Sequence, residues 1–501
     1  MAITAGGNLN SVPAPKQQTL ASNYIDFRDS NTAGWAQQYL PDLMEKEAEV
    51  FGPRTISGFL SQVGAEEAMS ADQVIWSEQG RLHLSYQGTV ATQGDVNGTF
   101  TITADIDGDT GVASSTSRTH AVRVNDTVLI ASSGIVTKCL VVETPDNNVI
   151  SVEPYDKADL TGHGTGSGAS ILLVIGSEYG KGQSYSDITG THSSDRREAI
   201  EPSFKSFSNK PIIMKDYYEV SGSDASAVGW VEISGEEGQS GYLWYLKAEG
   251  DTRARFTDYL EMAMIEAEKT VATSAIGFAN KQIRGQADAG ADGAGTEGLF
   301  AAIEDRGNLT SGVTGVNAAT DLAEFDAILA EFDKQGAIEE NMLFVNRATS
   351  LAFDDMLASM NSYGAGGTSY GVFDNSEDMA LNLGFSGFRR GSYDFYKSDF
   401  RYLNDKATRG EINRVAGSAA VRGVIIPAGV SSVYDQALGK NLKRPFLHVR
   451  FRASATDNRR MKTWVTGSVG AATSALDAMQ VHYLSERCLV VQGANNFMLM
   501  K

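Results

Sequence analysis

The feature that most constrains the fold is a long amphipathic segment in the middle of the chain, residues 241–278. Its apolar side chains recur at spacings of three and four residues, which places them on one face of an α-helix. They are Phe256, Leu260, Ala263, Met264, Ala267 and Val271. Met262 and Ile265 fall on roughly the opposite side. The spacing predicts one long helix with a buried stripe, and it predicts that Met262 and Ile265 make contacts outside the core of their own domain.

Residues 88–178 have a different texture, rich in Thr, Val, Ser, Asp and Gly. Alternating runs such as GTFTITADI and AVRVNDTVLIAS are separated by turn signals such as Asp-Gly-Asp, a pattern typical of a compact all-β module. The flanking segments RLHLSY and GSEYGKGQSYS do not complete a domain by themselves. We therefore expect residues 88–178 to be an inserted all-β domain.

The chain also contains segments that cannot fold alone. The first 30 residues mix Gly, Asn, Ser and Pro with few apolar positions, so they bury too little surface to offset the entropy of ordering. They predict an extended arm, and the residues after them predict a short helix interrupted at Pro41. Residues 200–235 alternate in polarity and predict a long two-stranded excursion just before the central helix.

The C-terminal half mixes the two kinds of pattern. TDLAEFDAILAEFDKQG has the spacing of a capped helix, whereas NMLFVN and AVRGVIIPAGV have the composition of buried strands. This mixture predicts an α+β domain. The chain finishes with MQVHYLSERCLVVQGANNFMLMK, which predicts a hairpin that turns at about Gly493–Asn495.

Composition limits the class of protein. The 501 residues are 42% apolar and 21% charged, as expected of a folded protein with about two to four structural units. No apolar run of about 18 residues predicts a transmembrane helix, and the start lacks the pattern of a secretory signal. The two cysteines, Cys139 and Cys488, argue against a disulfide framework and fit a reducing cytoplasm. A formal net charge of −20 argues against broad affinity for nucleic acid.

No set of side chains is matched in type and spacing for catalysis or metal binding. The six histidines occupy separate contexts without an H-x-x-x-H pair; they are His83, His120, His163, His192, His448 and His482. Gly176–Gly182 is one residue short of a phosphate loop, and Thr116 stands where a calcium loop beginning at Asp105 needs a glutamate. We therefore expect no catalytic residue, no metal site and no cofactor, and we expect that the chain is not an enzyme.

One basic cluster lies near the C-terminal end of this acidic chain: Arg450, Arg452, Arg459, Arg460 and Lys462. Two uses are open. The cluster could contact nucleic acid, but pairing with an acidic neighbouring subunit is favoured, because opposite charges steer association.

The order of the predicted elements resembles the major capsid protein of tailed double-stranded DNA bacteriophages (Caudoviricetes), the Hong Kong 97-like fold. The spine helix of that family resembles RARFTDYLEMAMIEAEKTVATSAI, and its closing strands resemble HYLSERCLVVQGANNFMLM. The inserted segment is similar in texture to capsid proteins of crAss-like phages. The resemblance implies an α+β fold with an extended N-arm (1–30), an N-terminal helix and first part of the extended loop (31–87), an inserted all-β accessory domain (88–178), the returning extended loop (179–240), a peripheral domain with the spine helix (241–310), an axial domain (311–470) and closing strands of the peripheral domain (471–501).

The same resemblance implies a function. Copies of the chain would self-assemble into hexamers and pentamers that form the icosahedral capsid shell around the double-stranded DNA genome. Implied partners are the portal vertex, scaffold and head decoration or fibre proteins, with packaged DNA nearby by proximity only and no membrane. The implied location is the virion capsid, made and assembled in the host bacterial cytoplasm. Some relatives link a lysine to an asparagine between subunits, and Lys205, Lys210 or Lys215 and Asn495 or Asn496 are conceivable partners by that resemblance.

Two other readings stay open. A phage tail or baseplate structural protein shares the acidic, glycine-rich texture, although a long central helix is less expected there. A surface adhesive or carbohydrate-binding β protein fits the inserted module and its Asp-rich turn, although no secretory signal accompanies it.

Overall fold

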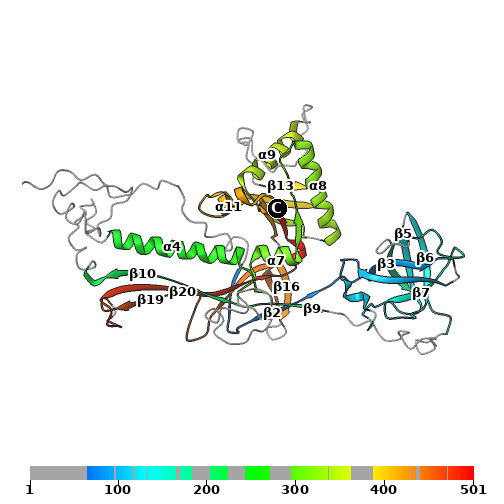
Figure 1. Ribbon diagram of the computed structural model, residues 1–501, viewed down its shortest axis with the longest axis horizontal. Helices are drawn as coiled ribbons and strands as arrows, with labels where there is room; N and C mark the ends of the chain where they lie inside the picture. The colour runs from blue at the N-terminus through cyan, green and yellow to red at the C-terminus, as the bar shows by residue number, and fades with distance from the viewer. Residues whose placement is uncertain are drawn as a thin grey trace, which may run out of the picture. The chain divides into compact units, whose positions relative to one another are not determined.

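The protein is described here by a computed structural model. The residues that it describes are 65–94, 97–114, 116, 119–132, 134–164, 170–182, 204–223, 243–270, 295–336, 338–362, 387–428, 430–435, 440–470 and 472–501. The predicted N-arm, the short helix near Pro41 and the part of the long helix beyond Thr270 lie outside the described residues. The chain forms two compact units, one of residues 1–76 with 208–501 and one of residues 77–207. Both helices and strands are present, so the fold class is α+β (Figure 1).

The first unit contains a five-stranded sheet with one long helix beside it. The sheet has the order β1-β18-β20-β10, and β19 pairs with residues 479–484 of β20, beyond the stretch that pairs with β18. Its strands are β1 (Ala65–Met69), β10 (Ile212–Ser221), β18 (Leu447–Arg452), β19 (Lys462–Gly467) and β20 (Ala478–Val491). Helix α4 (Leu243–Glu266) runs along β10 and β20 (Figure 1). Its residues Phe256 and Leu260 pack on Val481 and Tyr483, as the three-and-four spacing requires of a buried helix face.

A six-stranded mixed sheet forms the second half of this unit, in the order β11-β21-β15-β12-β14-β13. The strands are β11 (Asn308–Thr310), β12 (Glu340–Val345), β13 (Gly387–Arg390), β14 (Tyr393–Asp399), β15 (Gly423–Pro427) and β21 (Met498–Met500). Its helices are α8 (Ala318–Gln335), α9 (Arg347–Ser362), α10 (Arg401–Asn404) and α11 (Arg409–Ala416), and a 3-10 turn, η5 (Gly417–Ala419), follows α11. Phe325 of α8 packs against Phe353 of α9 and Phe395 of β14. Strands β16 (Val430–Asp435) and β17 (Lys440–Pro445) form a separate antiparallel pair.

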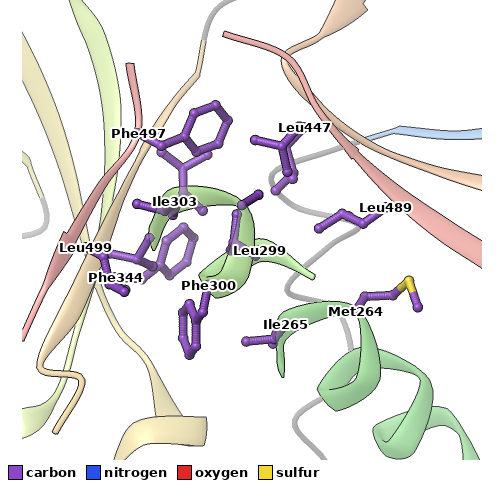
Figure 2. Close-up of a cluster of buried hydrophobic side chains, with 14 of the residues drawn as sticks. Met264, Ile265, Leu299, Phe300, Ile303, Phe344, Leu447, Leu489, Phe497 and Leu499 are labelled. Atoms are coloured by element: carbon purple, nitrogen blue, oxygen red, sulfur yellow. The ribbon is translucent and has the colours of Figure 1, made fainter. Parts of the chain in front are cut away.

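The two sheets share one apolar core around the short helix α7 (Leu299–Arg306). Figure 2 shows Leu299, Phe300 and Ile303 at the centre of this core. Leu447 and Leu489 reach it from the five-stranded sheet, and Phe344 and Leu499 reach it from the six-stranded sheet. Helix α4 contributes Met264 and Ile265. This core joins the long helix and both sheets into one body.

The prediction for the off-stripe residues of α4 is wrong. Ile265 is 1% exposed and belongs to the core around α7, and Met262 packs against the same core. The reason is that the C-terminal end of α4 is covered from two directions, by the strands on one side and by α7 on the other. A helix buried in this way carries apolar side chains on more than one face.

The helix is also shorter than the spacing predicted. It ends at Glu266, and the Ala267 carbonyl accepts a hydrogen bond of 2.8 Å from the amide of Gly298, which leads into α7. A Cβ atom at Gly298 would lie 2.7 Å from the backbone of Ala267. This close approach occupies the space into which another helical turn would grow.

One predicted strand pairing is wrong as well. Strands β20 and β21 do not form a hairpin: at Gly493, with φ 61°, and the turn η6 (Ala494–Asn496) the chain leaves one sheet for the other. Strand β10 pairs with β20, 478–491, and β9 (Phe204–Asn209) pairs with β2 (Val74–Gln79). The second strand of the predicted two-stranded excursion, GWVEISG, lies outside the described residues. The predicted boundary at residue 470 separates β18 and β19 from β20, to which both are hydrogen-bonded. Strand partners depend on distant residues, so local pattern alone could not select them.

The second unit is a closed six-stranded barrel, in the order β3-β4-β7-β6-β5-β8. The strands are β3 (Ser85–Thr92), β4 (Gly98–Asp105), β5 (Asp126–Ser132), β6 (Ile135–Glu143), β7 (Val149–Pro154) and β8 (Ser170–Ser177), with a short 3-10 turn, η1 (Thr110–Ala113), after β4. Alternate residues of β4 and β5 are buried, because side chains point inward at every second position. Phe100, Ile102 and Ile130 are among the fully buried core residues.

Candidate functional site

Several side chains considered as catalytic or metal-binding candidates form hydrogen bonds or ion pairs within the fold. His163 is buried in the barrel unit, where its Nδ1 lies 2.7 Å from Ser132 Oγ and its Nε2 lies 2.8 Å from Thr137 Oγ1. Burial, with a smaller contribution from the Lys157 ammonium, lowers the pKa of His163. Both ring nitrogens are therefore held by hydroxyl groups, and His192 lies outside the described residues.

The Asp-rich segment that begins at Asp105 is a hydrogen-bonded turn. Asp105 accepts a hydrogen bond from the amide of Asp109 at 2.7 Å, and Asp109 accepts one from the amide of Gly111 at 2.8 Å. The Lys205 ammonium, 2.9 Å from Asp109, is the main cause that lowers the pKa of that carboxyl. Among the described residues no group of three His, Cys, Asp or Glu side chains is placed to hold a metal ion.

The remaining chemical candidates lie in ordinary surroundings. Gly176 belongs to β8 and pairs with Thr127 of β5. Cys139 and Cys488 are free and buried, and burial raises the pKa of each thiol to about 12, which leaves them unreactive at neutral pH. No described helix is long and apolar enough to cross a membrane.

The structure shows the surroundings of several residues proposed for a lysine–asparagine link between subunits, but it does not test that link. Lys205 pairs with Asp109, and Lys215 lies opposite Leu484 in the five-stranded sheet. The Asn496 side-chain amide donates to the Gly493 carbonyl at 3.2 Å. Linkage between subunits stays a prediction.

The basic cluster pairs with carboxylates of its own chain, and contact with an acidic neighbouring subunit stays a prediction. Strand β1 lies parallel to β18 at the edge of the five-stranded sheet. Arg450 bonds Glu67 at 2.8 Å and Arg460 pairs with Glu66, both carboxylates on β1. The other pairs are Arg452 with Asp72 and Glu486, Arg459 with Glu486, Arg487 with Glu66, and Lys462 with Asp457. The cluster attaches an acidic edge strand, and its charge is largely neutralised there.

The surface most suited to binding another protein is the face of β10, β20 and β19 opposite α4. Met214 of β10 and Tyr483 of β20 face the helix. Side chains alternate between the two faces along a strand, so the odd-numbered residues of β10 and the even-numbered residues of β20 point to the other face. On that face His482 lies in register between Tyr217 and Trp464. Its ring is stacked on Trp464, with 5.1 Å between centroids, and on Tyr217, with 5.9 Å.

This aromatic row is partly accessible to solvent. Tyr217 is 56% exposed, and Ile213, four residues earlier on the same strand, is also exposed. Thr466 Oγ1 lies 2.7 Å from His482 Nε2 and fixes the orientation of the imidazole. Rigid aromatic groups held on a flat sheet are typical anchors of protein interfaces. The sequence did not reveal this row, because its three members come from strands whose pairing is visible only in the fold.

Comparison with known proteins gives remote likenesses. No protein-family model and no curated protein matches the chain. A solved structure of Microbacterium phage Oxtober96 is matched with 10% identity, a TM-score of 0.34, and coverage of 93% of this chain and 99% of that one. A chain of the capsid of a native GTA particle is matched with 10% identity and a TM-score of 0.35, covering 93% and 97%. The capsid of cyanophage Pam1 is matched with 12% identity and a TM-score of 0.33, covering 64% and 82%. These likenesses are too low to assign the chain to a family.

Proposed function

We propose that this chain is the major capsid protein of a tailed double-stranded DNA phage, with a Hong Kong 97-like fold. Copies assemble as hexamers and pentamers into the icosahedral shell around the genome. The observation that carries the proposal is the construction of the five-stranded sheet, with α4 along one face and an open aromatic row on the other. A layer that presents an aromatic row on the face opposite its helix is suited to contacts with further copies, because symmetric assembly repeats one contact around the shell.

Charge supports the same function. The chain carries a net charge of −20, and five members of the basic cluster are paired with carboxylates of the same chain. Few cations of this cluster remain to release counterions from DNA. A shell of such subunits encloses DNA by proximity without holding it.

The proposal includes the finer organisation implied by the sequence. Residues 1–30 act as the N-arm, 88–178 as an inserted accessory domain, 241–310 as the core of the peripheral domain and 311–470 as most of the axial domain. The portal vertex, scaffold and head decoration or fibre proteins are the proposed further partners. The proposed location is the virion, after assembly in the host bacterial cytoplasm.

Purified full-length protein tests the proposal directly. We expect electron microscopy and analytical ultracentrifugation to show closed shells, or hexamers and pentamers that convert to shells. Tubes or needles would favour a tail or baseplate protein instead. A species that stays monomeric at every concentration and in every assembly buffer would contradict the proposal.

The open face is tested by Tyr217→Ser. Loss of an aromatic anchor at a buried contact should raise the protein concentration needed for assembly on the order of tenfold. Tyr155→Ser is the matched control, because Tyr155 is an exposed tyrosine of the barrel unit. Circular dichroism checks that both variants are folded. Equal assembly of the two variants would show that the open face is not an assembly contact.

A further inference from the structure

Helix α11 has the reverse of the usual orientation of a surface helix. A surface helix normally turns its apolar residues toward the core and its polar residues toward water. In α11, Arg409–Ala416, the polar side chains of Arg409 and Asn413 contact the rest of the protein, whereas Ile412 and Val415 face solvent. The orientation is fixed by specific contacts, described next.

The inner face of α11 is held by Arg409 and Asn413, one turn apart. The Arg409 guanidinium pairs with Glu266 at the end of α4 and lies over the Phe300 ring at 5.6 Å. Asn413 makes two bonds to Val421: its amide donates to the Val421 carbonyl at 2.8 Å, and its carbonyl accepts from the Val421 amide at 3.0 Å. Rotation of the helix would break this whole set of contacts.

The outer face presents Ile412 and Val415, which are 59% and 72% exposed. Residues three apart are neighbours on a helix surface, so the two side chains form one apolar ridge. Beside them Arg414 Nε bonds Glu411 at 2.8 Å. Single exposed apolar residues are ordinary, but a paired ridge on a helix whose polar side is turned inward is the arrangement of an interface anchor.

The charge around the ridge indicates the kind of partner. Residues 401–422 contain five basic and two acidic residues within a chain of net charge −20; the basic ones are Arg401, Lys406, Arg409, Arg414 and Arg422. Three of the arginines already face carboxylates, namely Arg401 on Asp405, Arg409 on Glu266 and Arg414 on Glu411. Nucleic acid would have to compete with these pairs, and the apolar ridge offers nothing to a phosphate. An acidic protein surface fits both the residual basic character and the ridge.

We infer that the Ile412–Val415 ridge of α11 packs against a second copy of this chain. The inference rests on the proposed function, in which copies self-assemble, and it adds the residues that anchor one of the contacts. The second copy supplies the acidic surface, and ordering costs are small because α11 is already fixed by Arg409 and Asn413.

The first test is the full-length double variant Ile412→Ser with Val415→Ser. Its control is Ile175→Ser with Val136→Ser, an exposed isoleucine and an exposed valine of the barrel unit. We expect the α11 variant to need a protein concentration on the order of tenfold higher for self-association, with thermal stability equal to that of the wild type. If wild type and control assemble and the α11 variant assembles equally well, the ridge inference fails while the proposed function stands. If the wild type does not self-associate, the proposed function and the inference both fail.

The second test identifies the partner. Val415→Cys introduces an exposed thiol into a chain whose own two cysteines are buried, so a photoactivatable maleimide labels mainly that position. We expect irradiation of assembled protein to join two copies of this chain, with the linked peptide identified by mass spectrometry of a mixture of isotope-labelled and unlabelled protein. Links confined to one copy, or links to added duplex DNA in place of protein, would overturn the inference.

Discussion

Helix α4 and strand β1 are attached to the same five-stranded sheet by different forces. Phe256 of α4 is 1% exposed and packs on the Tyr483 ring at 6.0 Å between centroids. In β1 none of the residues Glu66–Met69 is buried, and its side-chain contacts to the sheet include ion pairs with Arg450, Arg460 and Arg487. Burial of apolar surface contributes about 25 cal/mol per Å², whereas a solvent-accessible ion pair contributes about 0–1 kcal/mol. Salt should therefore weaken the attachment of β1, whereas the attachment of α4 should not depend on salt.

The largest effect is expected at the helix. Phe256→Ala removes a fully buried ring and leaves a cavity against β20, so the unfolding free energy should fall by about 3–5 kcal/mol. Urea unfolding followed by circular dichroism measures the change. Tyr259→Ala, at an exposed position of the same helix, is the control and should cost far less. Similar losses for both variants would show that α4 is not held by its buried face.

An effect of intermediate size is expected at a buried polar side chain of the barrel, His163. His163→Ala leaves the hydroxyls of Ser132 and Thr137 without their imidazole, at a cost of about 1–3 kcal/mol. Hydrogen exchange of the barrel amides measures this locally, with His83→Ala at an exposed position as the control.

The same histidine gives a pH dependence whose sign follows from its lowered pKa. The unfolded chain protonates His163 first as the pH falls below about 6.5, because burial disfavours the charged form in the folded barrel. Protection of the barrel amides that comes from His163 should therefore be complete above that pH and decline below it. A pH profile unchanged by His163→Ala would contradict this account.

The smallest effect is expected at β1. Glu66→Gln removes the carboxylate that faces the exposed Arg460, whereas the buried Arg487 keeps its bonds to Ser485 and to the Arg460 carbonyl. The unfolding free energy should therefore change by about 1 kcal/mol or less. Exchange of the amides of Ala65–Met69 should accelerate, and salt at about 1 M should have the same local effect in the wild type. Glu331→Gln, which breaks the exposed pair with Lys334, should leave β1 unchanged. Slow, salt-independent exchange of the β1 amides would show that ion pairs are not what holds β1 on the sheet.

Part of the fold follows from local pattern. The helical spacing identified Phe256, Leu260 and Met264 as one face, and the structure buries all three. The mixture of helical and strand patterns indicated an α+β chain, which the structure has. The alternation in 88–178 predicted strands, and the barrel strands run from Ser85 to Ser177; its role as an inserted accessory domain stays a proposal. Each of these features depends on neighbours within a few residues.

Other features could not be read in advance, since they depend on residues far apart. The basic cluster has partners in its own chain, Glu66 and Glu67, that lie almost four hundred residues earlier. The aromatic row combines Tyr217, Trp464 and His482 from three strands. In α11 the sequence shows Ile412 and Val415 as an apolar pair. It does not show that Arg409 and Asn413 form the face of the helix that contacts the rest of the protein.

The sequence by itself determined which residues of α4 form a buried face and where strand-rich and helical segments alternate, because helical and strand periods are properties of the local backbone. Only the tertiary structure decided that α4 stops at Glu266, that Ile265 is buried, and that β20 and β21 belong to different sheets. The first two outcomes follow from the packing of α7 and the Gly298 backbone against the end of the helix. Such contacts join segments that are distant in the chain, and their free energy exists only once the core has formed.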